Sequence, residues 1–178
     1  MKKSTICQIQ LISFFFIYTF ILISGICAQQ ISVNALSLDN QLPSQSVQRI
    51  FQDKEGFIWL GTKEGLCRYD SYRILTYRSG LRTPNLLTDN EVTSIVEDRK
   101  GQLLVGTKKG INIIDKRTYQ ITHVENNELR DQEIRSMLVD SKGRIWVGTL
   151  TSVFRCSSDF LSCKRYDKSL YLHQLNLL

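Results

Sequence analysis

The sequence contains one unit written three times, and this repetition restricts the possible folds more than any other feature. Residues 53–65, 98–110 and 140–152 share an Asp, two polar residues, a Gly, one variable residue, three apolar residues and then Gly-Thr. The copies start 45 and 42 residues apart, and apolar residues recur three, six and eleven positions before each Asp. A period of this length indicates a solenoid, a propeller or another repeat array.

Each unit has the pattern of four short strands separated by turns. In the first copy, Asp53 and Gly56 favour a tight hairpin, because Asp bonds back to its own backbone and Gly accepts a positive φ. We expect Gly61 and Gly65 in the second turn and residues 70–73 in the third. The expected strands of this copy are residues 47–51, 57–60, 66–69 and 74–77.

Four antiparallel strands in a unit of about 40–45 residues are typical of a propeller blade. We therefore predict an all-β fold of about three four-stranded antiparallel β-propeller blades in an incomplete ring, at residues 42–86, 87–128 and 129–167. A helical solenoid of this period would need apolar residues at a spacing of 3.6, for which the glycines leave no room. Trp59 is expected between two blades, where Trp59→Ala would cost about 3–5 kcal/mol.

The N-terminus carries a different signal. Lys2 and Lys3 precede an apolar run over residues 11–27, and Ala28 supplies a small residue at a cleavage point. This pattern predicts a secretory signal peptide at residues 1–28 and a periplasmic protein. Two alternatives remain open: an uncleaved membrane anchor, because the run approaches the length that spans a bilayer, and a lipoprotein processed at Cys27.

The segments that flank the repeats do not follow the repeated pattern. Residues 31–38 alternate apolar and polar, which favours a strand contributed to the last blade of a ring, with Pro43 starting the loop into the first blade. Residues 168–178 are expected to form an irregular tail left by a truncation or a frameshift. Because a ring normally has 4–8 blades, three blades would expose two apolar faces, which predicts aggregation or a missing partner.

Charge and cysteine content add weaker constraints. Removing Lys2 and Lys3 lowers the formal net charge from +6 to +4, and the charges alternate in sign, so no basic stripe for nucleic acid is expected. Cys67, Cys156 and Cys163 are left after processing, an odd number in an oxidising compartment. A disulfide between the last two would fit a hairpin, although spacing alone does not decide it.

The search for catalytic or metal sites in the sequence is largely negative. His123 and His173 lack Cys, Asp or Glu at metal-ligand spacing. Asp53, Asp98 and Asp140 recur once per unit at a turn position without the further oxygen ligands of a calcium loop, so we interpret them as turn formers. No phosphate-binding loop, nucleophile motif or Cys-x-x-Cys is present. We therefore predict no catalytic, metal or cofactor-binding residue and no bound cofactor.

The unit at residues 53–70, together with Leu42-Pro43, resembles the two-component regulator propeller repeat. The resemblance covers residues 31 to about 167. It implies the periplasmic sensor region of a bacterial hybrid two-component system, with two seven-bladed propellers, a β-sandwich, a membrane helix, a histidine kinase, a receiver and often a DNA-binding module. Sensors of this kind commonly respond to oligosaccharides. This chain departs from the family because it has three units and no kinase or receiver motif.

The resemblance makes a ligand-sensing propeller segment the main functional hypothesis, and the chain itself is then not an enzyme. The expected partners are a glycan-derived small ligand and either the remaining propeller blades or a second copy in a homodimer. The alternatives are a propeller-type extracellular enzyme or quinoprotein, or a non-functional fragment of a sensor gene. Recognition is expected in the connections 78–91 and 122–133, but the sequence identifies no ligand-binding residue.

The tyrosines permit two interpretations. They can stack on sugar rings if they reach a blade surface, or they can pack within and between blades, which is the more common role of aromatic residues in strands. The residues concerned are Tyr69, Tyr72, Tyr77 and Tyr166.

Overall fold

The computed structural model describes residues 42–80 and 86–167. The predicted signal peptide at 1–28, the strand expected at 31–38 and the tail at 168–178 lie outside the described residues. Within the described part of the chain, no helix has the length and apolar character needed to cross a membrane.

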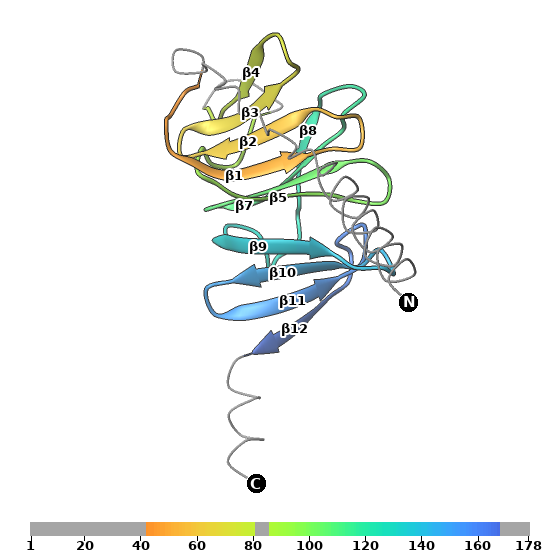
Figure 1. The fold of residues 1–178 in the computed structure, drawn as a ribbon. Coiled ribbons are helices and arrows are strands. Elements are labelled where there is room, and N and C mark those ends of the chain that lie inside the picture. The colour runs from red at the N-terminus through yellow and green to blue at the C-terminus, as the bar shows by residue number, and fades with distance from the viewer. Residues whose placement is uncertain (1–41, 81–85, 168–178) are drawn as a thin grey trace, which may run out of the picture. The chain divides into compact units, whose positions relative to one another are not determined.

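The described residues form three four-stranded antiparallel sheets, and each sheet uses consecutive strands of the chain (Figure 1). The predicted all-β fold of propeller blades is therefore confirmed. Blade 1 contains β1 (Val47–Gln52), β2 (Ile58–Thr62), β3 (Gly65–Tyr69) and β4 (Ile74–Tyr77). Blade 2 contains β5 (Val92–Glu97), β6 (Leu103–Thr107), β7 (Gly110–Ile114) and β8 (Ile121–His123). Blade 3 contains β9 (Ile134–Val139), β10 (Ile145–Thr149), β11 (Ser152–Cys156) and β12 (Cys163–Asp167).

The three blades share one strand register. Ile50 pairs with Leu60, Ile95 with Val105, and Met137 with Val147. The first strand pair of every blade also has a register shift near its start, which is typical of a β-bulge. The bulge leaves one extra residue in each first strand, at Gln48, Thr93 and Arg135. Corresponding positions in different blades can therefore be compared one by one.

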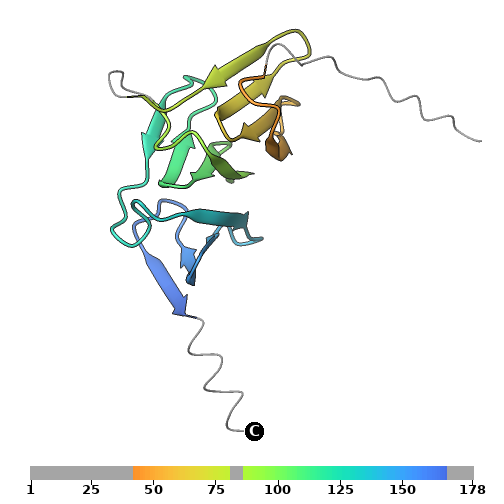
Figure 2. The ribbon, with the colours of Figure 1, turned by 90° about the vertical axis from the view of Figure 1, so that its left-hand side faces the viewer.

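Neighbouring blades pack through the first strand of the later blade. Strand β5 contacts β1 and β2, and β9 contacts β5 and β6. Both views of the ribbon place blade 2 between the other two (Figures 1 and 2). Two hydrogen bonds join the first strands of blades 2 and 3: the Thr93 hydroxyl donates to the Ile134 carbonyl, and the Met137 N–H donates to Ser94 Oγ at 2.9 Å.

The hydrophobic core consists of two clusters that lie between blades rather than inside one. The cluster between blades 1 and 2 is formed by Trp59, Leu66, Leu87, Val92, Ile95, Leu103, Val105, Ile114 and Ile121. The cluster between blades 2 and 3 is formed by Leu104, Ile111, Val124, Leu129, Ile134, Met137, Ile145, Val147, Phe154, Cys156 and Phe160. Each blade therefore depends on its neighbour to cover apolar side chains, as repeat architectures require.

The prediction that Gly61 belongs to the second turn is wrong, because Gly61 lies inside β2. A Cβ at this position would lie 2.7 Å from Val92 Cγ1 of blade 2. At the corresponding Gly106 in β6, a Cβ would lie 2.6 Å from Ile134 Cγ2 of blade 3. In blades 1 and 2, the glycine of the Gly-Thr pair therefore provides space for a β-branched side chain of the next blade. The second turn of blade 1 lies between Thr62 and Gly65.

Candidate functional site

The repeated Asp residues organise the first turn of each blade, as predicted. Asp53 Oδ1 accepts the backbone N–H groups of Glu55 and Phe57, each at 3.0 Å. Asp53 Oδ2 accepts the indole N–H of Trp59 at 2.8 Å. The carboxylate thus connects the turn to the buried indole in the following strand, a contact between side chains that the sequence analysis did not anticipate.

Blade 3 repeats this arrangement. Asp140 Oδ1 accepts the N–H groups of Lys142 and Arg144, and Asp140 Oδ2 accepts the Trp146 indole N–H at 3.1 Å. Desolvation alone would raise the pKa of Asp140, but the Trp146 indole and the Arg144 backbone and guanidinium outweigh it and hold the pKa well below its ordinary value. Asp140 therefore stays ionised as an acceptor and is unsuited to act as a general acid near neutral pH.

Blade 2 lacks the indole, and its carboxylate is left incomplete. Asp98 Oδ1 accepts the Gln102 N–H at 2.8 Å, but Asp98 Oδ2 is buried without a hydrogen-bond partner. Leu104 occupies the position of Trp59 and Trp146 and offers no donor. These contacts support the interpretation of the three Asp residues as turn formers. Among the described residues, no group of three His, Cys, Asp or Glu side chains is placed to hold a metal ion.

A buried lysine joins blades 1 and 2. Lys116 Nζ lies 3.5 Å from Asp53 Oδ2, 3.4 Å from Glu55 Oε1 and 3.2 Å from Glu97 Oε1. The Lys54 N–H also donates to Glu97 Oε2 at 3.0 Å. Because its charge is matched by three carboxylates, we assign Lys116 a structural role. Sequence reasoning missed this residue, since the turn in which it lies differs in length and sequence from the corresponding turn of blade 1.

A groove follows the connection between blades 2 and 3, which the sequence analysis proposed as a recognition surface. Its larger hollow has a volume of about 380 Å³ and a smaller one about 140 Å³. The two share His123, Val124 and Glu125. The larger hollow is lined by Ile113, His123, Val124, Glu125, Asn126, Asn127, Asp159, Phe160 and Leu161. Polar groups thus surround a small apolar floor, an arrangement suited to a polar ligand.

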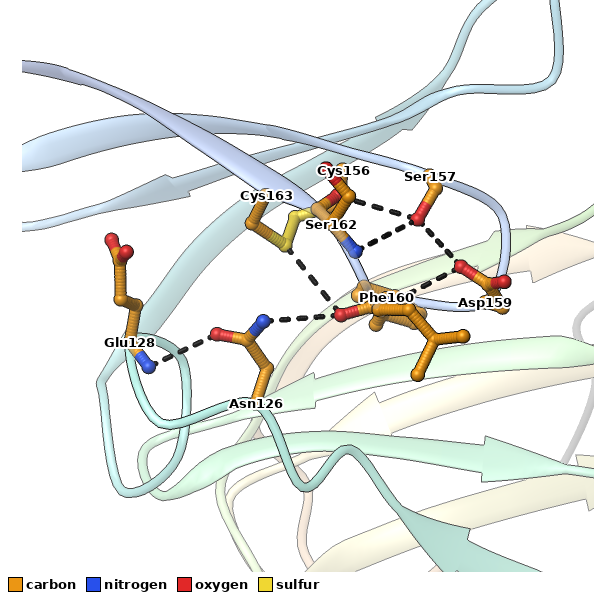
Figure 3. The surroundings of a disulfide bond; sticks show 9 residues. Asn126, Glu128, Cys156, Ser157, Asp159, Phe160, Ser162 and Cys163 are labelled. Atoms are coloured by element: carbon orange, nitrogen blue, oxygen red, sulfur yellow. Dashed lines mark hydrogen bonds between the residues drawn. A yellow bond between two sulfur atoms is a disulfide. The ribbon is translucent and has the colours of Figure 1, made fainter.

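The far wall of the groove is held by a disulfide bond between Cys156 and Cys163 (Figure 3). The structure thus forms the pairing that spacing left open. The bond joins β11 to β12 and closes a loop from which Phe160 enters the core between blades. Asn126 Nδ2 donates to the Phe160 carbonyl at 3.1 Å and Asn126 Oδ1 accepts the Glu128 N–H at 3.0 Å. Both walls of the groove are therefore fixed to each other.

The remaining candidate loops and side chains named from the sequence differ in their placement. Residues 81–85 of the connection 78–91 lie outside the described residues. His123 Nε2 lies 2.8 Å from the Leu86 carbonyl, and His173 lies outside the described residues. Tyr77 stacks on Trp59 and Tyr166 on Trp146, each with ring centroids 6.0 Å apart, so both belong to blade packing. Tyr72 differs, because it is 92% exposed.

A third hollow lies on the side of blade 3 that faces away from blade 2. It has a volume of about 480 Å³ and is predominantly apolar. Its lining residues are Trp146, Thr149, Leu150, Thr151, Ser152, Val153, Tyr166 and Asp167. Trp146, Val153 and Tyr166 hold the positions that Trp59, Leu66 and Tyr77 hold in blade 1. In blade 1 this side is covered by blade 2, whereas in blade 3 no described residue covers it.

Comparison with known proteins places this arrangement in a family. The model of the two component regulator propeller matches residues 41–64, 86–109 and 128–151. No match is found among the curated proteins. Among solved structures, one similar protein is the extracellular domain of a putative one component system from B. thetaiotaomicron. Its sequence is 27% identical to this chain and the TM-score is 0.55, and the match covers 64% of this chain and 16% of that one.

Two further solved structures are similar. A virginiamycin B lyase from Staphylococcus aureus is 15% identical with a TM-score of 0.53, over 71% of this chain and 43% of that one, which supports the fold alone. The extracellular domain of a putative hybrid two component system from B. thetaiotaomicron is 20% identical to this chain, over 76% of this chain and 26% of that one. Its TM-score of 0.45 is too low to support an inference. The chain thus spans less than half of each of these relatives.

The family match and the blades coincide. Each matched segment ends two residues after the second strand of a blade and includes its Asp turn and Gly-Thr pair. Three structural features correspond to the matched residues. They are the hydrogen-bonded Asp turn, the glycine that faces the next blade in blades 1 and 2, and the shared strand register. Each of the three blades thus contains a match to the two component regulator propeller repeat.

Proposed function

We propose that this chain is part of the extracellular, periplasmic sensor propeller of a two-component system and that it binds a ligand without transforming it. The observation that carries the proposal is the coincidence of all three family repeats with three blades, together with 27% identity to an extracellular domain from B. thetaiotaomicron. The likeness to the lyase extends to the fold only and gives no support to the enzyme alternative.

Within this function, we place ligand binding in the groove between blades 2 and 3. The exposed side chains of Glu125, Asn127 and Asp159 line the larger hollow. Asn127 makes no hydrogen bond within the described residues, and Glu125 contacts Arg130 only at 3.8 Å. These carboxylates and amides offer acceptors and donors to hydroxyl groups, which suits a glycan-derived small ligand.

The test is a binding screen of polysaccharide-derived oligosaccharides against the purified chain by calorimetry. A ligand that uses the groove should bind at least about tenfold more weakly to Glu125→Gln and Asn127→Ala, because each loses one polar contact worth about 1.4 kcal/mol. Glu128→Gln is the matched control, since its side chain is exposed next to the groove but does not line it.

Three outcomes separate the parts of the proposal. Binding lost in the groove variants and kept in Glu128→Gln supports both the sensor role and the site. Binding that none of the variants changes would remove the groove as the site. Chemical conversion of a bound ligand, detected by mass spectrometry of the mixture, would contradict a binding function and restore the enzyme alternative.

A further inference from the structure

Every blade exposes a large apolar side chain at the same position, two residues before its fourth strand. These side chains are Tyr72, Tyr119 and Leu161, which precede β4, β8 and β12 and are 92%, 38% and 85% exposed. We call them the apolar tips. Single exposed apolar side chains are common on protein surfaces and need no explanation. A tip that recurs in blades with different turn sequences instead indicates a surface for interaction.

The apolar tips lie at one end of the blades, which we call the turn end. In four consecutive antiparallel strands, the turn before the fourth strand lies at the same end as the turn after the first. Contacts show that neighbouring blades share this end. Lys116 Nζ, in the turn before the fourth strand of blade 2, lies 3.5 Å from Asp53 Oδ2, in the first turn of blade 1. A Cβ on Gly143, in the first turn of blade 3, would lie 2.8 Å from Arg99 Cδ, in the first turn of blade 2.

The exposed charges of the turn end are mainly positive. Four exposed cations in its turns make no ion pair with a described residue, namely Arg99, Lys100, Arg117 and Lys142. The turn aspartates of blades 2 and 3 are buried or half-buried and accept backbone N–H groups of their own turns, so they add little negative charge to the surface. Among the described residues of these turns, the exposed carboxylates are those of Glu55 and Asp159.

The opposite end of the blades has a different character. Several exposed carboxylates project there from the connection between blades 2 and 3, namely Glu125, Glu128 and Asp131. The turns at that end carry the exposed cations Lys63 in blade 1 and Lys109 in blade 2. They carry one large exposed apolar residue, Leu150 in blade 3, which is 64% exposed. In the described blades, the combination of a repeated apolar tip and an excess of exposed cations is therefore specific to the turn end.

The chemistry of the turn end fits an anionic lipid surface. A tyrosine has an apolar ring and a polar hydroxyl, which suits the boundary between lipid headgroups and acyl chains. Exposed lysines and arginines are attracted to anionic headgroups. Binding to a bilayer depends on the total apolar area inserted, so tips on separate turns contribute together. A small polar ligand would be expected in a hollow instead, and neither Tyr72 nor Tyr119 lines one of the hollows described above.

We propose that the turn end docks on the surface of an anionic phospholipid bilayer, with the apolar tips at the level of the headgroups and the exposed cations facing lipid phosphates. Docking at this end leaves the connections between blades on the side away from the lipid. The inference goes beyond the proposed function, because it requires neither a ligand nor a signal. One tip, Leu161, also lines the larger hollow of the groove, so the experiment is done without ligand.

The test compares the reactivity of lysines at the two ends of the blades. The purified full chain is mixed with vesicles of phosphatidylglycerol and phosphatidylethanolamine in equal amounts, lysines are acetylated with a water-soluble reagent, and mass spectrometry locates the modified residues. These vesicles should protect Lys100 and Lys142 at the turn end and leave Lys63 and Lys109 reactive. Vesicles of phosphatidylcholine alone, which have no net charge, should protect neither pair. Attachment through the N-terminal apolar segment does not by itself select one end of the blades.

Two double variants separate the apolar and the charged contributions. Tyr72→Ser with Leu161→Ser removes two apolar tips, and Arg99→Gln with Arg117→Gln removes two cations. Each should raise the lipid concentration that half-protects the turn-end lysines at least about tenfold. Leu150→Ser is the matched control, because it removes an exposed apolar side chain at the opposite end and should leave the protection unchanged. Circular dichroism of each variant checks that the sheets are intact, as expected for substitutions at exposed positions.

Equal reactivity of the lysines at both ends in the presence of anionic vesicles would overturn the proposal, and so would protection that phosphatidylcholine reproduces. Protection that the double variant of the tips leaves unchanged would contradict insertion of the tips. A parallel sample with polygalacturonate, a soluble acidic polysaccharide, tests the other class of anionic partner. Protection of Lys100 and Lys142 by this polysaccharide and not by the vesicles would assign the turn end to a glycan and reject docking on lipid.

Discussion

At the scale of single residues, the blades differ in how well the turn carboxylate is satisfied. Asp53 and Asp140 each accept an indole N–H, whereas Asp98 Oδ2 has no donor because Leu104 stands where the other blades have tryptophan. A buried acceptor without a donor costs about 1–3 kcal/mol. Blade 2 therefore gains less stability from its own turn than blades 1 and 3 gain from theirs.

This difference predicts unequal effects of the same substitution. Asp53→Asn should lower the free energy of unfolding by about 2–3 kcal/mol, because the new amide presents a donor to the indole N–H and removes a charge that faces Lys116. Asp98→Asn should cost less than about 1 kcal/mol, because its Oδ2 has no hydrogen bond to lose. Urea unfolding of both variants measures the difference, and equal losses would contradict this account.

The two tryptophans form a second matched pair. Trp59 is fully buried between blades 1 and 2, whereas Trp146 is half-buried on the side of blade 3 that faces away from blade 2. Trp59→Ala should cost about 3–5 kcal/mol, the range for deletion of a large core side chain. Trp146→Ala should cost clearly less, because no described residue of another blade covers Trp146. Urea unfolding measures both changes in the free energy of unfolding. Equal changes would show that contacts with the neighbouring blade do not account for the contribution of Trp59.

At the scale of secondary-structure elements, the glycine of the Gly-Thr pair sets how closely two blades approach. Gly106→Ala should lower the free energy of unfolding by about 1–3 kcal/mol, since the added methyl would lie 2.6 Å from Ile134 Cγ2. Combining it with Ile134→Ala should cost less than the sum of the two single changes, because the smaller residue relieves the clash. Gly80→Ala, in a loop outside the strands, is the control.

The last hairpin carries the disulfide, whose sequence separation is 7. Cys163→Ser should lower the free energy of unfolding by about 2–3 kcal/mol, the chain-entropy value for so short a loop. Alkylation of the native, unreduced protein followed by mass spectrometry should modify neither Cys156 nor Cys163. Two alkylated thiols at these positions without reduction would contradict the disulfide. Phe160 lies inside the closed loop, so a loss larger than this range would point to displacement of its ring from the core.

Most elements could be predicted from the sequence, because strand runs and turn residues recur at fixed spacing. The fourth strand of blade 1 was expected at residues 74–77 and is found there. The role of Gly61 could not be read from one copy, since glycine is equally typical of turns and of close approach. Only the structure distinguishes a turn glycine from a close-approach glycine here, because it places Val92 of blade 2 next to Gly61. Likewise, Lys116 and the groove residue Asp159 lie in turns that differ between blades, so repetition gave no signal for them.

At the scale of the molecule, stability is distributed from the centre outwards. Blade 2 has neighbours on both sides, whereas blades 1 and 3 each have one outer side without a neighbour among the described residues. Nearest-neighbour coupling of this kind makes terminal repeats open more readily than internal ones. The matched positions Thr62, Thr107 and Thr149 end the second strand of each blade and allow a direct comparison.

Native-state hydrogen exchange should therefore be slowest in β6 and faster in β10, although the two strands have the same length and register. Uniform exchange across all three blades would indicate that they unfold as a single cooperative unit.

The glycine at each joint also affects how such a chain can lengthen. The space at Gly61 and the side chain of Val92 that occupies it lie 31 positions apart, but every unit carries its own copy of both parts. A duplication of one unit in the gene would reproduce a matching pair of surfaces at both of its ends. The inserted blade would fit between existing ones without further substitutions, so arrays of different length can arise by copying alone.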